Sequence, residues 1–405
     1  MAFLARYAAA FGRNGAFMLR MAGLTGGELS ADGAWITDTG GRRWLDFGSF
    51  GVHLLGHRHP VVTAHAHEQL NLMGLSGKVL GNAAATSCGE ALLAATPPNL
   101  DRVTLANTGA EAVDMAVKMV LLATGRDELL AFNRSYHGKT VAALSLSDTV
   151  QTAASIGLRN QVHFAEPEDL AAVRRILAAR RVAGVFVEPV QGEGGVRPIS
   201  PGFLAGLRGL CTATGTPLVF DEIQTGLGRT GRRWRSADDV PPDLLLAGKT
   251  LGGGLVPLSA VVFDGSVIGS VATDPVVLAS SFAGGAFACR IGSAVLGLVQ
   301  DEKLLARVRE LGARATSELR ATFADDPRIR EVRGEGLMIG IDTAAPSVAG
   351  HLVVEAAKRG LLVSFCLSYP QVVRVYPPAV ISDDDLTCGL DALAGAVSAI
   401  PEPAV

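Results

Sequence analysis

From about residue 100 onward, short apolar runs alternate with stretches of helical periodicity, and this alternation restricts the fold more than any other feature. The apolar runs, which we expect to be strands, are 102–106, 128–132, 183–187, 218–220, 244–247 and 259–263. Helical patterns lie between several of them, at 110–123, 168–180 and 202–214. Such alternation is typical of a mostly parallel sheet that helices cover on both faces. The predicted fold class is α/β.

The segments on either side of this region predict two further units. Residues 34–47 contain two short strand patterns around a Gly-containing turn, which predicts a hairpin. After residue 290, a helical stretch precedes short apolar runs at 337–341, 361–364 and 372–375. We expect an N-terminal helix and hairpin (1–50), a large domain (51–290) and a smaller α+β domain (291–405). The helical stretch of the last unit covers 291–323.

The composition excludes several classes of protein. Hydrophobic residues make up 48% of the chain and charged residues 19%, which suits a large core. The net charge of −3 argues against nucleic acid or an anionic membrane as a partner. No long apolar run is free of charge, so no membrane span is expected. The 5 cysteines are scattered without a C-x-x-C pair, which predicts reduced, buried thiols in a cytoplasmic protein.

The first 24 residues superficially resemble a targeting peptide, because they are apolar, basic and free of acids. Their arginines are Arg6, Arg13 and Arg20. A spacing of seven places these side chains on one side of a helix, and they interrupt any apolar region of signal-peptide length. We therefore expect an amphipathic helix that packs with the small domain and on a partner subunit.

Ligands of open α/β sheets bind beyond the carboxyl ends of the strands, so the residues that follow each strand are informative. After 102–106, Thr108 and Glu111 have the spacing of a capping box, which predicts a helix start. Gly109 and Ala110 leave the first amides of that helix open to an anion. Taken by itself, this segment is better explained by a capped helix without any ligand.

Polar residues also follow the next two predicted strands. Tyr136 comes after 128–132 and is able to stack on a planar ring, or to cover the edge of the core. Glu188 and Glu193 lie in a glycine-rich segment directly after 183–187. Charges are costly beside a buried strand unless they serve a purpose, although a solvated loop would also accommodate them.

Asp221 continues the apolar strand 218–220, so its carboxylate should be buried and need a cationic partner. A protonated pyridine nitrogen would serve, and Gln224 could then hydrogen-bond a phenolic oxygen on the same ring. The alternatives are a helix cap or a buried ion pair with an arginine.

Lys249 is distinctive among only six lysines, since it alone follows an apolar strand and precedes a glycine run. Lys303 and Lys358 lie in charged helical stretches and are expected at the surface. Burial and nearby positive charge lower the pKa of an amine and make it nucleophilic toward an aldehyde. The residues described above thus provide an anion site, a stacking ring, two polar partners for a pyridine ring and an isolated lysine. Pyridoxal 5′-phosphate (PLP) requires this combination of groups.

With these residues identified, the sequence resembles the class III (subgroup II) aminotransferases of fold type I over about residues 30–390. The matching stretches are Asp-Phe at 46–47, Gly-His-Arg-His-Pro at 56–60, Asn-Thr-Gly-Ala-Glu-Ala at 107–112, Tyr-His-Gly-Lys at 136–139, the run 188–195, the run 221–231, Gly-Lys at 248–249 and Val-Arg-Gly-Glu-Gly-Leu-Met at 332–338. This resemblance implies a mostly parallel central sheet and a smaller C-terminal domain.

The resemblance also implies roles for individual residues. Lys249 would hold PLP as a Schiff base and move the substrate proton, and Asp221 would pair with the pyridine nitrogen. The further cofactor-binding residues that it implies are Gly109, Ala110, Tyr136, His137, Glu188, Gln224 and Ser281. Ser281 stands where the family usually has a threonine that reaches a neighbouring subunit's phosphate. The family's Gly-Gly-Asn-Pro is replaced there by Ala-Gly-Gly-Ala at 283–286.

Substrate binding is implied for Arg374, Glu193, Phe50 and His53. Arg374 matches the family arginine that grips the α-carboxylate, and Glu193 matches the glutamate that pairs with it when no carboxylate is bound. One pocket would then accept both glutamate and an ω-amine. The segment 49–58 is most similar to the branch that acts on terminal amines such as putrescine.

The expected function is a PLP-dependent transaminase that moves an amino group between an amino acid, with glutamate as the expected donor, and a keto acid or aldehyde. A homodimer with shared active sites is expected. An aminomutase or a decarboxylating transaminase is an alternative on the same fold. A nucleotide-binding protein is disfavoured, because arginines rather than an apolar helix follow the G-x-G-x-x-G at 226–231. No metal is expected, since the histidines at 53–67 lack paired acids or cysteines.

Overall fold

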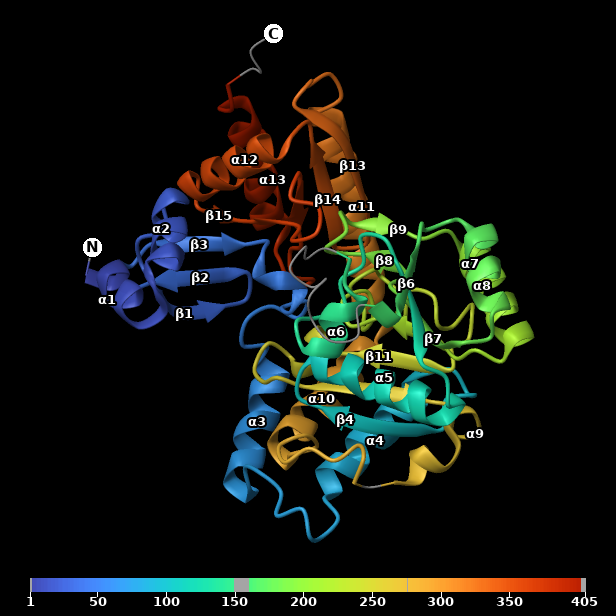
Figure 1. Cartoon of the computed structure of the whole chain (residues 1–405). Coiled ribbons are helices and arrows are strands. Elements are labelled where there is room, and N and C mark those ends of the chain that lie inside the picture. Colours follow the sequence, from blue (N-terminus) through green and yellow to red (C-terminus); the bar gives the residue numbers. More distant parts are fainter. Residues whose placement is uncertain (1, 149–159, 275, 402–405) are drawn as a thin grey trace.

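The computed structural model describes residues 2–148, 160–274 and 276–401. Its centre is a seven-stranded sheet of order β4-β12-β11-β10-β7-β5-β6 (Figure 1). The strands are β4 (Arg102–Ala106), β5 (Glu128–Phe132), β6 (Val162–Ala165), β7 (Val182–Val187), β10 (Leu218–Asp221), β11 (Leu244–Ala247) and β12 (Ser259–Phe263). Only β12 runs antiparallel to its neighbours, β11 and β4. The mostly parallel sheet predicted from the sequence is confirmed.

Both faces of this sheet are buried, which explains why its strands are continuous apolar runs. In β11, Leu244 and Leu246 belong to one apolar cluster and Leu245 and Ala247 to the other, as the two-residue period of a strand requires. The helices over the first face are α5 (Gly109–Thr124), α6 (Val141–Leu146) and α9 (Gly265–Ile268). Those over the second are α3 (Pro60–Leu72), α4 (Ala83–Ala95), α7 (Leu170–Ala178), α8 (Pro201–Thr214) and α10 (Ala286–Val299).

Two smaller sheets lie beside the central one. The first joins both ends of the chain: β1 (Glu28–Asp32), β2 (Trp35–Asp38) and β3 (Arg43–Asp46) are antiparallel, and β15 (Leu361–Leu362) pairs with β3 (Figure 1). The second has the order β13-β14-β17-β16, and its strands are β13 (Ile329–Glu335), β14 (Met338–Thr343), β17 (Val372–Val375) and β16 (Ser364–Phe365). The hairpin predicted within 34–47 is therefore β2–β3. The domain boundaries at residues 50 and 290 remain a proposal.

Helices α11 (Glu302–Thr322), α12 (Pro346–Lys358) and α13 (Asp383–Ser398) pack with these sheets around a common apolar cluster. The single helical stretch expected at 291–323 is wrong in one respect, since α10 ends at Val299 and α11 begins at Glu302. The break is explained by Asp301, whose carboxylate accepts a hydrogen bond of 2.9 Å from the Lys303 amide and caps α11.

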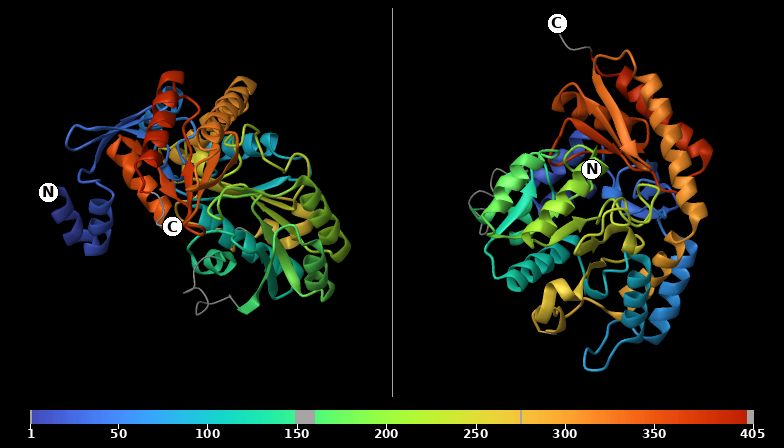
Figure 2. Two further views of the ribbon diagram at one scale, coloured as in Figure 1. Left: turned by 90° about the horizontal axis from the view of Figure 1, so that it is seen from above. Right: turned by 90° about the vertical axis from the view of Figure 1, so that its right-hand side faces the viewer.

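The N-terminal segment forms two short helices, α1 (Ala2–Phe11) and α2 (Arg13–Met21), instead of the single helix expected. They are separated at Gly12, whose φ of 96° a residue with a side chain rarely adopts. The left view of Figure 2 shows the pair standing away from the rest of the chain. Apolar side chains such as Phe11 and Phe17 are largely exposed on it. Packing of this pair on a partner subunit remains a prediction.

Two expectations from composition concern membrane segments and cysteines. Within the described ranges, no helix has the length and apolar character that crossing a membrane requires. All 5 cysteines are free thiols, and four of them are buried. Cys388 is exposed on α13, so the expectation of burial is wrong for this residue.

Candidate active site

A cavity of about 280 Å³ lies beyond the carboxyl ends of the central strands. It is lined by Gly109, Ala110, Tyr136, His137, Gly138, Lys139, Glu188, Val190, Glu193, Asp221, Ile223, Gln224 and Lys249. Most of the residues predicted from strand-end positions are therefore brought together here. Their convergence follows from the parallel strands, whose carboxyl ends meet at one edge of the sheet.

Lys249 directly follows β11 and Gly248, and it begins a short 3-10 turn, η4 (Lys249–Gly252). Its φ of 45° is unusual for a residue with a side chain, and such conformations are concentrated at functional sites. Burial lowers the pKa of the Lys249 amine below its ordinary value, and the charge of Arg374 adds to this effect. Nearby carboxylates, Glu193 first among them, oppose the shift. The other five lysines are exposed.

Asp221 is buried at the end of β10, as the apolar strand before it predicts. One of its oxygens lies 2.8 Å from Nδ1 of His137, and the other accepts a hydrogen bond of 3.1 Å from the Ile223 amide. Burial alone would lower the pKa of His137, but the hydrogen bond and charge of Asp221 hold it above its ordinary value. The cationic partner in this structure is thus a histidine, and not one of the arginines considered from the sequence.

Glu188 joins two loops of the site. Its Oε1 accepts a hydrogen bond of 2.8 Å from the Tyr136 amide, and its Oε2 accepts one of 3.4 Å from Gly192. Burial raises the pKa of Glu188 to about 7, and the negative charge of Asp221 acts in the same direction. Near neutral pH this carboxyl group therefore exists in both its charged and its neutral form.

Gln224 is held by Tyr376, whose hydroxyl donates a hydrogen bond of 3.2 Å to Oε1 of the amide. A Cβ atom at Gly192 would lie 1.6 Å from the same oxygen, so only glycine allows Gln224 to occupy this position. Tyr376 was not among the residues predicted for the site. Its position two residues after Arg374, at the end of an apolar strand, is the signal that could have indicated it.

Arg374 and Glu193 form an ion pair through Nη1 and Oε1, and both side chains are almost fully buried. Nη2 of Arg374 donates a hydrogen bond of 2.9 Å to Ser364 Oγ. Glu193 in turn accepts one of 2.8 Å from the Leu367 amide. The ring of Phe50 lies with its centre 5.1 Å from Cζ of Arg374. The two residues that the resemblance paired are in contact.

The amino end of α5 forms another wall of the cavity. Thr108 Oγ accepts a hydrogen bond of 3.2 Å from the Glu111 amide, as the capping-box spacing predicts. Glu111 reaches back to Asn107, where its carboxylate accepts hydrogen bonds of 2.9 Å from the amide and 2.8 Å from the side chain. Gly109 and Ala110 line the cavity with the first turn of the helix, whose dipole favours an anion.

Four predicted residues are not in the lining of this cavity: Arg374, which pairs with Glu193, Phe50, which lies over Arg374 as described above, and Ser281 and His53. Ser281 is exposed and lines a second cavity of about 770 Å³, next to the loop that precedes α5: Ser280 Oγ is 3.4 Å from the Asn107 side chain. His53 stacks on His57 with ring centres 3.9 Å apart, and burial lowers the pKa of His53 to about 4. Whether Ser281 reaches a partner's phosphate remains a prediction.

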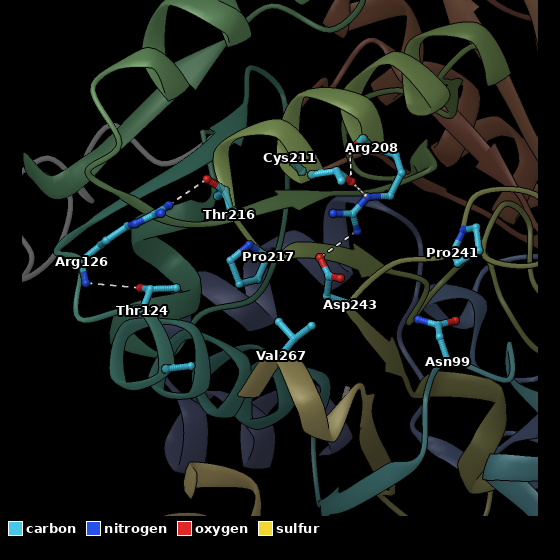
Figure 3. A pocket seen from close by; sticks show the side chains of 13 residues that line it. Asn99, Thr124, Arg126, Arg208, Cys211, Thr216, Pro217, Pro241, Asp243 and Val267 are labelled. Carbon is cyan, nitrogen blue, oxygen red and sulfur yellow. Dashed lines mark hydrogen bonds and ion pairs between the residues drawn. The ribbon is translucent and has the colours of Figure 1, made fainter. Parts of the chain in front are cut away.

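A third cavity, of about 540 Å³, lies at the opposite edge of the sheet (Figure 3). It is lined by residues that precede strands, among them Arg126 before β5 and Asp243 before β11. Arg208 donates a hydrogen bond of 2.7 Å to Asp243, and Arg126 donates one of 2.9 Å to Thr216. These cations already have protein partners, and ligands of open α/β sheets bind at the other edge.

The residues of the first cavity fit PLP in the chemistry that they offer. The amino end of α5 provides backbone amides for a phosphate, the Asp221 carboxylate suits a protonated ring nitrogen, and the Lys249 amine suits an aldehyde. Gln224 and Tyr136 border the space between these groups. In the described part of the chain, no cluster of three or more histidines, cysteines or acids could hold a metal ion. The fold and the site thus define a PLP-dependent enzyme of fold type I.

The sequence matches the class-III aminotransferase family over residues 29–397, and the chain belongs to this family. A 5-aminovalerate aminotransferase of Pseudomonas aeruginosa is 35% identical over 392 residues, with 90% of this chain and 91% of the relative covered. An acetylornithine aminotransferase of Bordetella parapertussis is 34% identical over 365 residues, with 87% and 90% covered. The resemblance stated from the motifs is confirmed, and the protein is a PLP-dependent aminotransferase.

A solved structure supports the same conclusion for the fold. The ornithine aminotransferase of Toxoplasma gondii ME49 superimposes with a TM-score of 0.86 at 31% sequence identity, covering 92% of this chain and 90% of that one. Another structure of the ornithine aminotransferase from this organism is described as having PLP at partial occupancy in its active site. Fold type I and the PLP cofactor are therefore confirmed expectations.

Proposed function

We propose that this aminotransferase moves a terminal amino group of an amino acid or amine to a keto acid, with glutamate as the amino acid that completes the cycle. The buried ion pair between Arg374 and Glu193 carries this proposal. Relatives named for 5-aminovalerate, acetylornithine and ornithine support it. Each of these substrates carries an amino group at the end of its chain, far from the carboxylate.

The pair provides two states of one pocket. When Arg374 is paired with Glu193, its charge is neutralised and a substrate without an α-carboxylate meets no free cation. When glutamate binds, its α-carboxylate replaces Glu193 as the partner of the guanidinium and accepts two parallel hydrogen bonds from its planar fork of N–H groups. In both states the buried Arg374 guanidinium has a carboxylate partner, without which its burial would be strongly unfavourable.

PLP, when bound, supplies the conjugated ring that withdraws electrons from the substrate carbon. The protein residues move and hold protons around that carbon. Nζ of Lys249, with its lowered pKa, would take up the proton from the substrate carbon that bears the amino group and deliver it to the aldehyde-derived carbon of the cofactor, not back to the same carbon. Asp221 would face the ring nitrogen, and its orientation is fixed by His137 and by the Ile223 amide. Gln224 would meet the ring hydroxyl and is held by Tyr376.

A screen of half-reactions tests the proposal directly. PLP-loaded enzyme is mixed separately with glutamate, 5-aminovalerate, N-acetylornithine, ornithine, putrescine and alanine, and the visible absorption of the cofactor is followed. We expect glutamate and at least one ω-amino substrate to convert the cofactor to its amine form, and alanine to react poorly. Absence of reaction with glutamate, or with every ω-amino substrate, would contradict the proposal.

We also infer a homodimer, which would act in the cytoplasm. Leu80, which is largely exposed, lines the cavity that contains Ser281, and the exposed Val79 and Phe282 are chain neighbours of residues that line it. Large apolar side chains left exposed in this way are typical of a site of protein association. Light scattering on the PLP-loaded enzyme should give the mass of a dimer at micromolar concentration. A monomer mass with full activity would contradict shared active sites.

A further inference from the structure

Three consecutive residues of the turn η1 (Ser49–Gly51) have a left-handed backbone. Their φ angles are 35° for Ser49, 51° for Phe50 and 77° for Gly51. Glycine adopts this conformation freely, whereas Ser49 and Phe50 are strained by it. A strained turn persists only when surrounding contacts hold it, so the contacts around this segment are informative.

Asp46, at the end of β3, holds the beginning of the turn. Its Oδ1 accepts a hydrogen bond of 2.9 Å from the Gly48 amide, and its Oδ2 accepts one from the Ser49 hydroxyl. The same Oδ2 lies 2.8 Å from Nε2 of His57. Burial would raise the pKa of Asp46, but the hydrogen bonds of His57, Ser49 and Gly48 keep it below the ordinary value. The anchor is therefore a buried, charged carboxylate.

Arg229 holds the other end of the turn. Its guanidinium is fully buried and donates a hydrogen bond of 3.3 Å to the Gly51 carbonyl. It also donates one of 2.8 Å to the Pro377 carbonyl, beside Tyr376. A Cβ atom at Gly51 would lie only 3.1 Å from the Tyr376 ring, so the turn presses directly against that residue. The turn is thus fixed relative to the strand that carries Arg374.

Phe50 projects from the middle of this turn and covers the Arg374 guanidinium. The distance of 5.1 Å from its ring centre to Cζ is within the range of a cation–π contact. Phe50 is 55% exposed, so one side of the ring remains available to a substrate. The contact is present together with the ion pair of Arg374 and Glu193. Because the guanidinium is already paired and an aromatic ring covers it, this part of the pocket should bind an uncharged carbon chain of the substrate better than a substrate carboxylate.

We propose that Asp46 is a positioning residue for substrate specificity: by holding the Ser49–Gly51 turn, it keeps Phe50 over Arg374 and favours substrates whose reacting end carries no α-carboxylate. This inference rests on the proposed function, in which Arg374 serves two kinds of substrate. Asp46 does not line the cavity, and in this proposal it acts through the turn and Phe50.

The test compares Asp46→Asn with a matched variant, Asp38→Asn. Asp38 is a buried acid at the end of β2 in the same small sheet, and it accepts hydrogen bonds from Gly40, Arg42 and Trp44. It makes no hydrogen bond to the Ser49–Gly51 turn in the described structure. In the PLP-loaded enzymes, kcat and KM are measured separately for 5-aminovalerate and for glutamate. We expect Asp46→Asn to raise the KM for 5-aminovalerate about fivefold.

The KM for glutamate should stay within about twofold in Asp46→Asn, and Asp38→Asn should leave the ratio of the two KM values unchanged. Phe50→Ala should show the same selective effect as Asp46→Asn. The double variant should show no more than Phe50→Ala alone, because both changes remove one contact. Equal changes for both substrates, an unchanged ratio in Asp46→Asn, or effects that add in the double variant would overturn the inference.

Hydrogen–deuterium exchange of residues 47–58 provides a second readout that does not depend on turnover. Amides of this segment should exchange faster in Asp46→Asn than in the wild type or in Asp38→Asn. Unchanged exchange overturns the inference on its own. If the wild type converts neither glutamate nor 5-aminovalerate, the proposed function fails, and the exchange rates still decide whether Asp46 holds the turn.

Discussion

Nδ1 of His137 lies 2.8 Å from Oδ2 of Asp221, and neither side chain is more than slightly exposed. A buried carboxylate without a partner is strongly unfavourable, so the imidazole both stabilises Asp221 and fixes its direction. The Ile223 amide holds the second oxygen at 3.1 Å. These two contacts leave Asp221 oriented at the edge of the cavity before any cofactor binds, which is how a protein lowers the free energy needed to organise a site.

Replacing His137 with phenylalanine should weaken PLP binding and slow turnover by about 10- to 100-fold, a range usual for loss of a residue that supports a binding group. The aromatic ring keeps a planar group in this position, although a slightly larger one, and removes the hydrogen bond to Asp221. The measurements are the Kd of PLP by fluorescence titration and kcat with glutamate. His351→Phe on the surface of α12 is the control and should retain both values. Equal affinity and rate in His137→Phe would contradict the role.

Loss of Lys249 should abolish the chemistry while preserving the fold. In Lys249→Ala, turnover should fall by about 10³-fold or more, because the proton-transferring amine is gone. The visible absorption of lysine-bound PLP should disappear as well. Lys303→Ala removes an exposed lysine of α11 and should retain both properties. Normal absorption and rate in Lys249→Ala would rule out the assignment.

Glu188 should make the stability of the PLP-free protein depend on pH. Its pKa of about 7 in the folded chain lies above the ordinary value of 4.5, so the folded state binds the proton more tightly than the unfolded state. The stabilisation is complete below pH 4.5 and is lost as the pH rises through about 7. Glu188→Gln removes this group, and its stability relative to the wild type should rise between pH 5 and pH 8 by on the order of 3 kcal/mol. Urea unfolding at both pH values measures the difference, and an identical pH profile in the two proteins would contradict the raised pKa.

The contacts of Tyr376 with Gln224 and of His137 with Asp221 could not be predicted from the sequence. The strands that precede these residues, or that end in Asp221, could be predicted. Asp221 and Lys249 were found because each follows a strand that is apolar on both faces, and such strands end at the same edge of the sheet. The hydrogen bonds join residues 84 and 152 positions apart, and only tertiary packing determines which side chains meet. Strand β6 was not predicted from the sequence, because it is only partly buried and lacks a continuous apolar run.

Glycine at position 192 should be required for the site. In Gly192→Ala, the added Cβ would lie 1.6 Å from Oε1 of Gln224, so Gln224 must leave Tyr376 or the loop must shift. We expect PLP to bind about tenfold more weakly and the protein to lose about 1–3 kcal/mol of stability, as overpacking usually causes. Gly209→Ala in α8 is the matched control, because its Cβ meets nothing within 4 Å and alanine favours a helix. A Gly192→Ala enzyme with wild-type affinity for PLP and wild-type stability would contradict the requirement for glycine at this position.

Neutralising Glu193 should change the KM values for glutamate and for an ω-amino substrate in different ways. In Glu193→Gln the Arg374 guanidinium loses its ionic partner but remains buried, so a substrate that brings its own carboxylate replaces what was lost. We expect the KM for glutamate to fall or stay the same, and the KM for 5-aminovalerate to rise about tenfold, equivalent to about 1.4 kcal/mol. Arg374→Gln should show the opposite pattern, with glutamate losing most of its affinity and 5-aminovalerate little. Steady-state kinetics of both variants with both substrates provide the test. If the two variants shift the two KM values in the same direction, the pair does not select between substrates and must instead support the structure of the pocket.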